Sequence, residues 1–176
     1  MNLYDLNSDI ITINIYGKDI EMKHPICYGK EYDKWLVSKY GTVYSLYRNR
    51  FLTGKIDYSY AKNKRYIKAC QLTLSTPLGF WEDGSGNSCG KRNTLDRKIS
   101  FHKVVMDTWK PLYNNPPDDI CWEEWEIVRD LPDTFDHISK TVVIDHIDNN
   151  PLNNHLDNLR RINQWTNNPH IKSKGL

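Results

Sequence analysis

The residue types best suited to chemistry gather in one short segment of this chain, residues 142–168. The segment opens with an apolar run that predicts a β-strand, and Asp145 and His146 stand at its end. A turn rich in asparagine follows, because asparagine side chains bond their own backbone and favour turns. A second predicted strand begins near Asn158, and Asn167 comes shortly after it. The segment therefore offers a carboxylate, an imidazole and several amides close together in the sequence.

This set of side chains suits the hydrolysis of a phosphodiester bond. The reaction needs an activated water, a neutralised phosphate and a stabilised leaving oxygen. Histidine can activate the water, because its ordinary pKa of about 6.5 leaves the imidazole largely neutral at physiological pH. A divalent cation can supply the other two and prefers carboxylate and amide oxygens as ligands. Asp145 and His146 are neighbours in an extended strand, so we expect one to face the cation and the other the water.

Each residue also has an ordinary structural interpretation. Asp145 could cap a turn, His146 could be a partly buried histidine without a chemical role, and Asn158 could simply end a turn. A single Asp-His pair is common. The ordered set of features over the whole segment is more specific than any one of them.

The ordered segment resembles the HNH, or ββα-metal, nuclease motif. The matching features are the Asp-His pair, the asparagine-rich turn, the triplet at residues 158–160 and a late asparagine. The resemblance implies that His146 is the general base and that Asn158 orients this histidine by hydrogen bonding. It also implies that Asp145 and Asn167 bind one divalent cation, Mg²⁺ with Mn²⁺ as the alternative.

The metal ligand after the second strand is the least certain of these positions. Asn163 could cap a short final helix that carries Asn167. Asn168 is adjacent and could be the ligand instead. Pro169 follows almost at once and would shorten or kink that helix, because proline removes a helical hydrogen bond and clashes with the preceding turn.

Two further histidines lie near the motif or inside it. His102 resembles a histidine that precedes the HNH segment in phage-type homing endonucleases, but packing between a strand and a helix explains it equally well. His155 lies in the asparagine-rich turn, where its position and spacing do not fit the general base.

The N-terminal half carries a second resemblance. Residues 32–46 are similar to a small NUMOD4-like module that often precedes HNH motifs. Its core residues here are Val37, Ser38, Gly41, Val43, Ser45 and Leu46. A β-hairpin that matches by chance is the alternative interpretation.

A basic stretch follows this module. Between Arg48 and Lys68 there are seven basic residues and one acid, interleaved with tyrosines. Basic side chains bind phosphates, and we expect this stretch to contact double-stranded DNA together with the basic pair after Asn158. A solvated β surface is the alternative. The expected DNA-binding residues are Arg48, Arg50, Lys55, Lys62, Lys64, Arg65, Lys68, Arg160 and Arg161.

Charge is segregated along the chain although the net charge is only +2. The block 118–136 contains eight acids and one base, and we expect it to face away from DNA or to pack against basic neighbours. The four cysteines show no CxxC spacing, so we expect free thiols and no zinc, which disfavours a zinc-ribbon module. The sequence has no apolar run long enough for a membrane span, and the pattern of its first residues leads us to expect no secretory leader. We therefore expect a cytoplasmic protein, in a bacterial host cell if the chain is phage-encoded.

These patterns predict an α+β fold with a β-rich N-terminal half and a C-terminal ββα-metal motif. Residues 1–95 would form a DNA-binding region and residues 96–176 an HNH nuclease domain, with the oligomeric state left open. The expected elements are a hairpin at 10–22, a strand at 65–74 and a helix at 103–109. The resemblance implies a metal-dependent DNA endonuclease of the site-selective homing type. The alternatives are a less specific HNH nuclease for DNA processing or restriction and a catalytically inactive HNH-fold DNA-binding protein.

Overall fold

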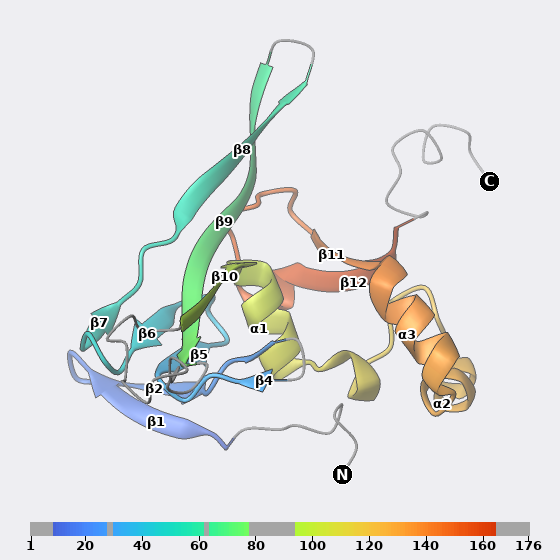
Figure 1. Ribbon diagram of the computed structural model, residues 1–176, viewed down its shortest axis with the longest axis horizontal. Helices are drawn as coiled ribbons and strands as arrows, with labels where there is room; N and C mark the ends of the chain where they lie inside the picture. Colours follow the sequence, from blue (N-terminus) through green and yellow to red (C-terminus); the bar gives the residue numbers. More distant parts are fainter. Residues whose placement is uncertain (1–8, 28–29, 62–63, 78–93, 165–176) are drawn as a thin grey trace, which may run out of the picture.

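The structure of this chain is a computed structural model that describes residues 9–27, 30–61, 64–77 and 94–164 (Figure 1). For residues 59–61, 64–77 and 94–98 it describes the path of the backbone only. The described chain is a mixture of β-sheets and short helices. Strands β1 to β10 all lie between Ile11 and Ser100, and the α-helices all lie after Ser100.

The N-terminal sheet has five antiparallel strands in the order β1-β2-β5-β6-β7. The predicted hairpin at 10–22 is confirmed, because β1 and β2 pair through a turn in which Tyr16 and Gly17 have positive φ. The module expected at 32–46 provides β5, β6 and the turn between them. The bounds are β1 (Ile11–Ile15), β2 (Lys18–Lys23), β5 (Trp35–Ser38), β6 (Val43–Ser45) and β7 (Arg50–Phe51), beside a short pair of β3 (Ile26–Cys27) and β4 (Lys30–Glu31).

In a second sheet, the hairpin of β8 (Lys55–Ala61) and β9 (Lys64–Pro77) forms an arm that extends away from the body of the molecule (Figure 1). The strand order of this sheet is β10-β9-β8, with β10 at Thr94–Ser100. The strand predicted at 65–74 lies within β9. The loop expected at 82–93 lies outside the described residues.

Helix α1 (Phe101–Trp109) follows β10 directly and ends before Pro111, as the sequence predicts, although it begins at Phe101 rather than Lys103. Its apolar side chains lie at helical spacing and enter a hydrophobic core that joins both halves of the chain. This core crosses the expected division at residue 95, so the two regions share one interior. Its members are Cys27, Tyr32, Val37, Val43, Ile99, Phe101, Val104, Val105, Met106, Leu156 and Leu159.

The C-terminal part contains two helices that were not predicted. After the 3-10 turn η1 (Leu112–Asn114), α2 (Trp122–Arg129) and α3 (Pro132–Thr141) form a helical hairpin at the end of the molecule opposite β1 and β7 (Figure 1). Strands β11 (Val142–His146) and β12 (Leu159–Asn163) pair antiparallel, with η2 (Leu156–Asn158) between them. Among the described residues, no helix is long and apolar enough to cross a membrane.

Candidate active site

The pairing of β11 with β12 places the Asp-His pair beside the basic pair. Asp145 lies opposite Arg160, and His146 lies opposite Leu159. Residues directly opposite each other in an antiparallel pair share a face of the sheet. Leu159 belongs to the hydrophobic core and His146 is buried with it, whereas Asp145 is only half-buried. The two neighbouring side chains thus point to opposite faces, as expected from the extended strand.

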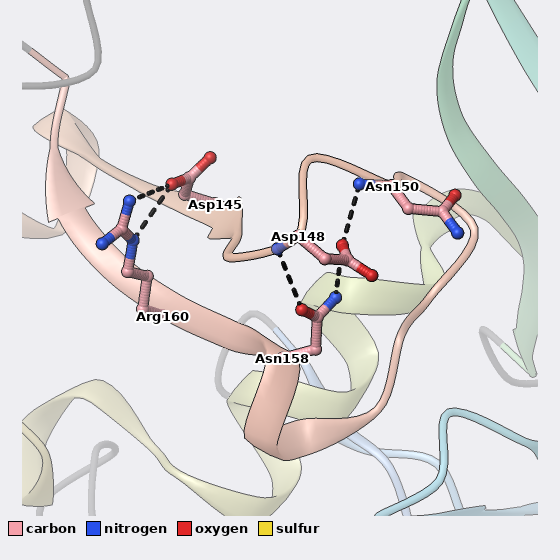
Figure 2. A network of polar contacts seen from close by, with 5 residues as sticks. All are labelled: Asp145, Asp148, Asn150, Asn158 and Arg160. Carbon is pink, nitrogen blue, oxygen red and sulfur yellow. Dashed lines mark hydrogen bonds and ion pairs between the residues drawn. The ribbon is translucent and has the colours of Figure 1, made fainter.

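The carboxylate of Asp145 is paired with a guanidinium. Arg160 donates two hydrogen bonds to the same oxygen, Oδ2, from Nε at 3.0 Å and from Nη2 at 2.8 Å (Figure 2). The other oxygen, Oδ1, receives no hydrogen bond from the described residues. Arg160 was expected to contact DNA. In the structure its guanidinium orients the carboxylate that was expected to bind the metal.

The loop between β11 and β12 is organised around Asp148. Its carboxylate accepts hydrogen bonds from Asn153 Nδ2 at 2.8 Å, from the Asn150 backbone N–H at 2.8 Å and from Asn158 Nδ2 at 2.9 Å. Figure 2 shows two of these contacts. The bonds from Asn153, Asn150 and Asn158, in that order, hold the pKa of Asp148 below its ordinary value because they stabilise the ionised form.

Asn158 ties the end of this loop to its beginning. Its Oδ1 accepts from the Asp148 N–H at 3.1 Å, and its Nδ2 also donates to the Asn153 carbonyl at 2.9 Å. The expected hydrogen bond from Asn158 to the imidazole is therefore corrected. His146 Nε2 instead lies 3.2 Å from Asn154 Oδ1. The physical reason is that Asn158 faces the loop, whereas His146 faces the core.

A second imidazole packs against the first. The rings of His102 and His146 lie edge to face with centroids 5.2 Å apart. Nδ1 of His102 is buried and has no hydrogen-bond partner among the described residues. Burial first, and the neighbouring His146 second, lower the pKa of His102 to about 4, so this imidazole is neutral at physiological pH. The sequence pointed to His102 only through resemblance.

Arg161, which was expected to contact DNA, lies in the interior of the structure. It is buried, with 4% of its surface exposed, and donates hydrogen bonds to Asp107 Oδ1 at 3.1 Å and to the Lys110 carbonyl. Neighbouring residues of a strand point to opposite faces, so Arg160 and Arg161 cannot both face outward. Arg161 therefore fastens β12 to α1.

The other predicted DNA-binding residues lie in the N-terminal region and its arm. Arg48 and Arg50 are exposed around the turn between β6 and β7, and Lys55 is exposed at the start of β8. The remaining members are Lys64, Arg65 and Lys68, which lie on β9 where only the backbone is described, and Lys62, which lies outside the described residues.

The expected metal site is described only in part. No group of three or more His, Cys, Asp or Glu side chains among the described residues could hold a metal ion. The expected ligand pair contains only one carboxylate, that of Asp145, because the second ligand, Asn167, is an amide. Asn167 lies outside the described residues, as do Asn168 and the residues expected to form a final helix. Asp145 fits the role, because its Oδ1 is a carboxylate oxygen of the type that hard divalent cations prefer.

Comparison with known proteins gives one structural likeness. No protein-family model matches the chain, and no curated protein matches it in sequence. A solved structure titled "DNA binding and cleavage by the HNH homing endonuclease I-HmuI" aligns with a TM-score of 0.44 and 18% sequence identity. The alignment covers 89% of this chain and 60% of that chain. The assignment of function rests on the residues of this chain.

Proposed function

We propose that this protein is a divalent-metal-dependent endonuclease of the HNH type that hydrolyses phosphodiester bonds in double-stranded DNA. The observation that carries the proposal is the register of β11 and β12. This register places the imidazole of His146 on the buried face of β11 and the carboxylate of the preceding residue, Asp145, on the other face, at the entrance of a loop that Asn158 closes. A proton acceptor next to an acidic oxygen ligand is the pair of groups that metal-assisted hydrolysis needs.

In this proposal each residue has one task. His146 accepts the proton of the attacking water. Asp145 and Asn167 hold the cation, with Mg²⁺ preferred and Mn²⁺ as the alternative, and Arg160 orients the Asp145 carboxylate from its other oxygen. A bound cation neutralises the phosphate and stabilises the leaving oxygen. Asn158 keeps the loop closed so that these groups hold their spacing.

The distribution of charge supports an approach of DNA from one side. Arg48, Arg50 and Lys55 are exposed near β7, at the end of the molecule opposite the helical hairpin (Figure 1). All eight acids of the block 118–136 are exposed, on that hairpin or beside it. A polyanion is attracted by the first end and repelled by the second. Site-selective cutting of the homing type belongs to this proposal, and discrete fragments from long DNA would separate it from less specific cleavage.

A specific contact favours a second candidate, a DNA-binding protein with an HNH fold and no hydrolysis. The guanidinium of Arg160 already neutralises the Asp145 carboxylate. A cation competes with this positive charge for the same group. If this charge keeps the cation from Oδ1 of Asp145, the chain binds DNA without cutting it.

The first experiment incubates the purified full chain with long duplex DNA in Mg²⁺, in Mn²⁺ and in EDTA. His146→Ala is the test variant, and His137→Ala, which removes an exposed histidine of α3, is its matched control. Loss of a general base lowers a rate by about 10²–10⁴-fold. We expect metal-dependent cutting by the wild type and by His137→Ala, and a loss of this size in His146→Ala.

The other outcomes are equally informative. Equal cutting by His146→Ala would show a contaminating nuclease or a wrong base. Salt-sensitive DNA binding without cutting, on DNA that includes many possible target sites, would favour the second candidate.

A further inference from the structure

The buried amide of Asn154 faces one of the two ring nitrogens of His146. Asn154 is 7% exposed, and its Oδ1 lies 3.2 Å from Nε2 of His146. Its Nδ2 donates to the Leu152 carbonyl at 3.2 Å, so the amide oxygen is the atom that faces the imidazole. An amide oxygen can only accept a hydrogen bond. In the neutral imidazole Nε2 is therefore the protonated nitrogen, and Nδ1 keeps its lone pair.

We propose that Asn154 is a positioning residue that holds His146 in the Nε2–H tautomer, so that Nδ1 is the atom that takes the proton from water. The turn of the N-terminal sheet at residues 39–41 in turn holds Asn154 in place. This inference rests on the proposed function, because it assigns the base atom of the same reaction.

The contact between the turn and the loop is a close backbone approach. Gly41 lies between β5 and β6 with φ +76°, a conformation that side chains of the L configuration rarely adopt. A Cβ at this position would lie 2.7 Å from the carbonyl oxygen of Asn154 and 2.8 Å from its Cβ. No side chain fits there unless Asn154 moves. The backbone of Gly41 therefore packs directly against Asn154 and limits where this residue can lie.

Two further contacts from the same turn hold the loop on either side of this approach. The Leu156 N–H donates to the Lys39 carbonyl at 2.8 Å. The ring of Tyr40 packs edge to face on His155 with centroids 5.2 Å apart. Three successive residues of the turn thus engage residues 154–156.

His102 limits the remaining freedom of the imidazole. Its ring meets His146 edge to face. The base is therefore enclosed by groups from three parts of the chain: the amide of its own loop, the first turn of α1, and, through Asn154, the N-terminal sheet. A ring that is confined in this way has little room to exchange the positions of its two nitrogens.

The test measures the tautomer directly. The full chain is isotopically labelled at the imidazole nitrogens, and nuclear magnetic resonance spectra are taken well above the ordinary histidine pKa of about 6.5. The His146 signal is assigned by its absence from His146→Ala. We expect a fixed Nε2–H tautomer in the wild type and in Asn154→Asp, which keeps an acceptor. We expect an average of both tautomers in Asn154→Leu, which has none.

Gly41→Ala extends the test to the N-terminal sheet, with Gly17→Ala as its matched control. Gly17 has a similar φ of +78° but nothing within 4 Å of an added Cβ, so the control carries the same backbone strain without the collision. We expect Gly41→Ala to move the His146 signal toward that of Asn154→Leu, and Gly17→Ala to leave it unchanged. Displacement of a catalytic group by about 1 Å can lower a rate about 10²-fold. We expect a loss of this size in the kcat of Asn154→Leu, with the KM for DNA unchanged.

An Nδ1–H tautomer in the wild type would overturn the proposal, and this spectrum needs no variant to fold. A fixed tautomer that persists in a folded Asn154→Leu would also overturn it. Failure of the proposed function is a separate result. If the wild type cuts no DNA with any metal, the nuclease assignment fails, while the spectra still decide whether Asn154 sets the tautomer.

Discussion

The loop between β11 and β12 and the hairpin of α2 and α3 are neighbours in the chain, but different forces hold them. The loop is fixed by hydrogen bonds from amides to Asp148 and to backbone atoms. The hairpin is fixed by aromatic packing, in which Trp125 and Phe135 are almost fully buried with ring centroids 5.8 Å apart. Hydrogen bonds are directional and act on particular atoms, whereas packing depends on shape and area. Substitutions in the loop should therefore change chemistry more than stability, and those in the hairpin the reverse.

The largest effect on stability is expected from Trp125→Ala. This residue is fully buried, and replacing a buried tryptophan with alanine costs about 3–5 kcal/mol. Unfolding by urea measures the loss, and Trp122→Ala, at a position 44% exposed, is the control with a smaller effect. Cleavage by the folded variant at low temperature should stay near the wild-type rate. A folded Trp125→Ala variant that has lost cleavage would contradict the expectation that the hairpin contributes to stability and not to chemistry.

Arg161→Met is expected to come next, because Arg161 fastens the site to α1. Removing one partner of a buried ion pair costs about 3–5 kcal/mol. The low end is expected here, since Lys103 still pairs with Asp107 at 2.7 Å. The matched control is Arg160→Met, because the side chains of its pair with Asp145 are 36% and 17% exposed, closer to a surface ion pair, which contributes about 0–1 kcal/mol. Thermal unfolding measures both variants. If Arg161→Met and Arg160→Met lose similar amounts of unfolding free energy, the burial of Arg161 does not explain its contribution to stability.

Asn158→Asp sharpens the comparison within the loop itself. The substitution keeps the shape of the side chain but turns a donor into a carboxylate that faces the carboxylate of Asp148. An unmade hydrogen bond costs about 1–3 kcal/mol, and the misplaced loop should lower the cleavage rate about 10²-fold. Asn150→Asp is the control, because it adds the same charge nearby but keeps its acceptor for the Leu152 N–H. If both variants cleave equally, charge alone explains the result.

The smallest expected effect is the dependence of stability on pH that arises from Asp148. Its pKa is lower in the folded protein, so the unfolded chain binds this proton more tightly. The contribution is present above the ordinary aspartate pKa of about 3.9, and it is lost as the pH falls through the lowered folded value. Asp148→Asn should weaken the fall in unfolding free energy below about pH 4. Asp133→Asn, which removes a charge from the hairpin, is the control, and an equal change in both variants would contradict the assignment to Asp148.

Local patterns predicted the elements that frame the site. The apolar run before Asp145 and the stretch after Asn158 are paired strands, and Pro111 ends α1 within the expected residues. Helices α2 and α3 were missed although their signals were present. Acids occupy the first turn of each, a base occupies the last turn, and Pro132 opens α3. These are ordinary helix boundaries, and the aromatic residues between them mark the buried side.

Contacts between distant segments could not be read from the sequence. No local sequence pattern shows that Gly41 contacts Asn154. None shows that Arg161 is buried in a hydrogen-bonded ion pair with Asp107. The partner of the imidazole was misassigned for the same reason. Asn154 and Asn158 are both asparagines of one loop, and only the fold determines which of them faces the core.

The arm of β8 and β9 has a consequence for how such a chain can vary. It leaves the body after β7, and Ile99, at the end of β10, is the next described residue of the chain that belongs to the core cluster (Figure 1). Each residue added to both strands would lengthen the arm by about 3.4 Å. Doubling a connecting loop costs only about 0.6 kcal/mol in closure entropy. Insertions and deletions can therefore accumulate in the arm while the contact of Gly41 with Asn154 stays intact. The length of the arm can thus change in evolution without a change in the candidate active site.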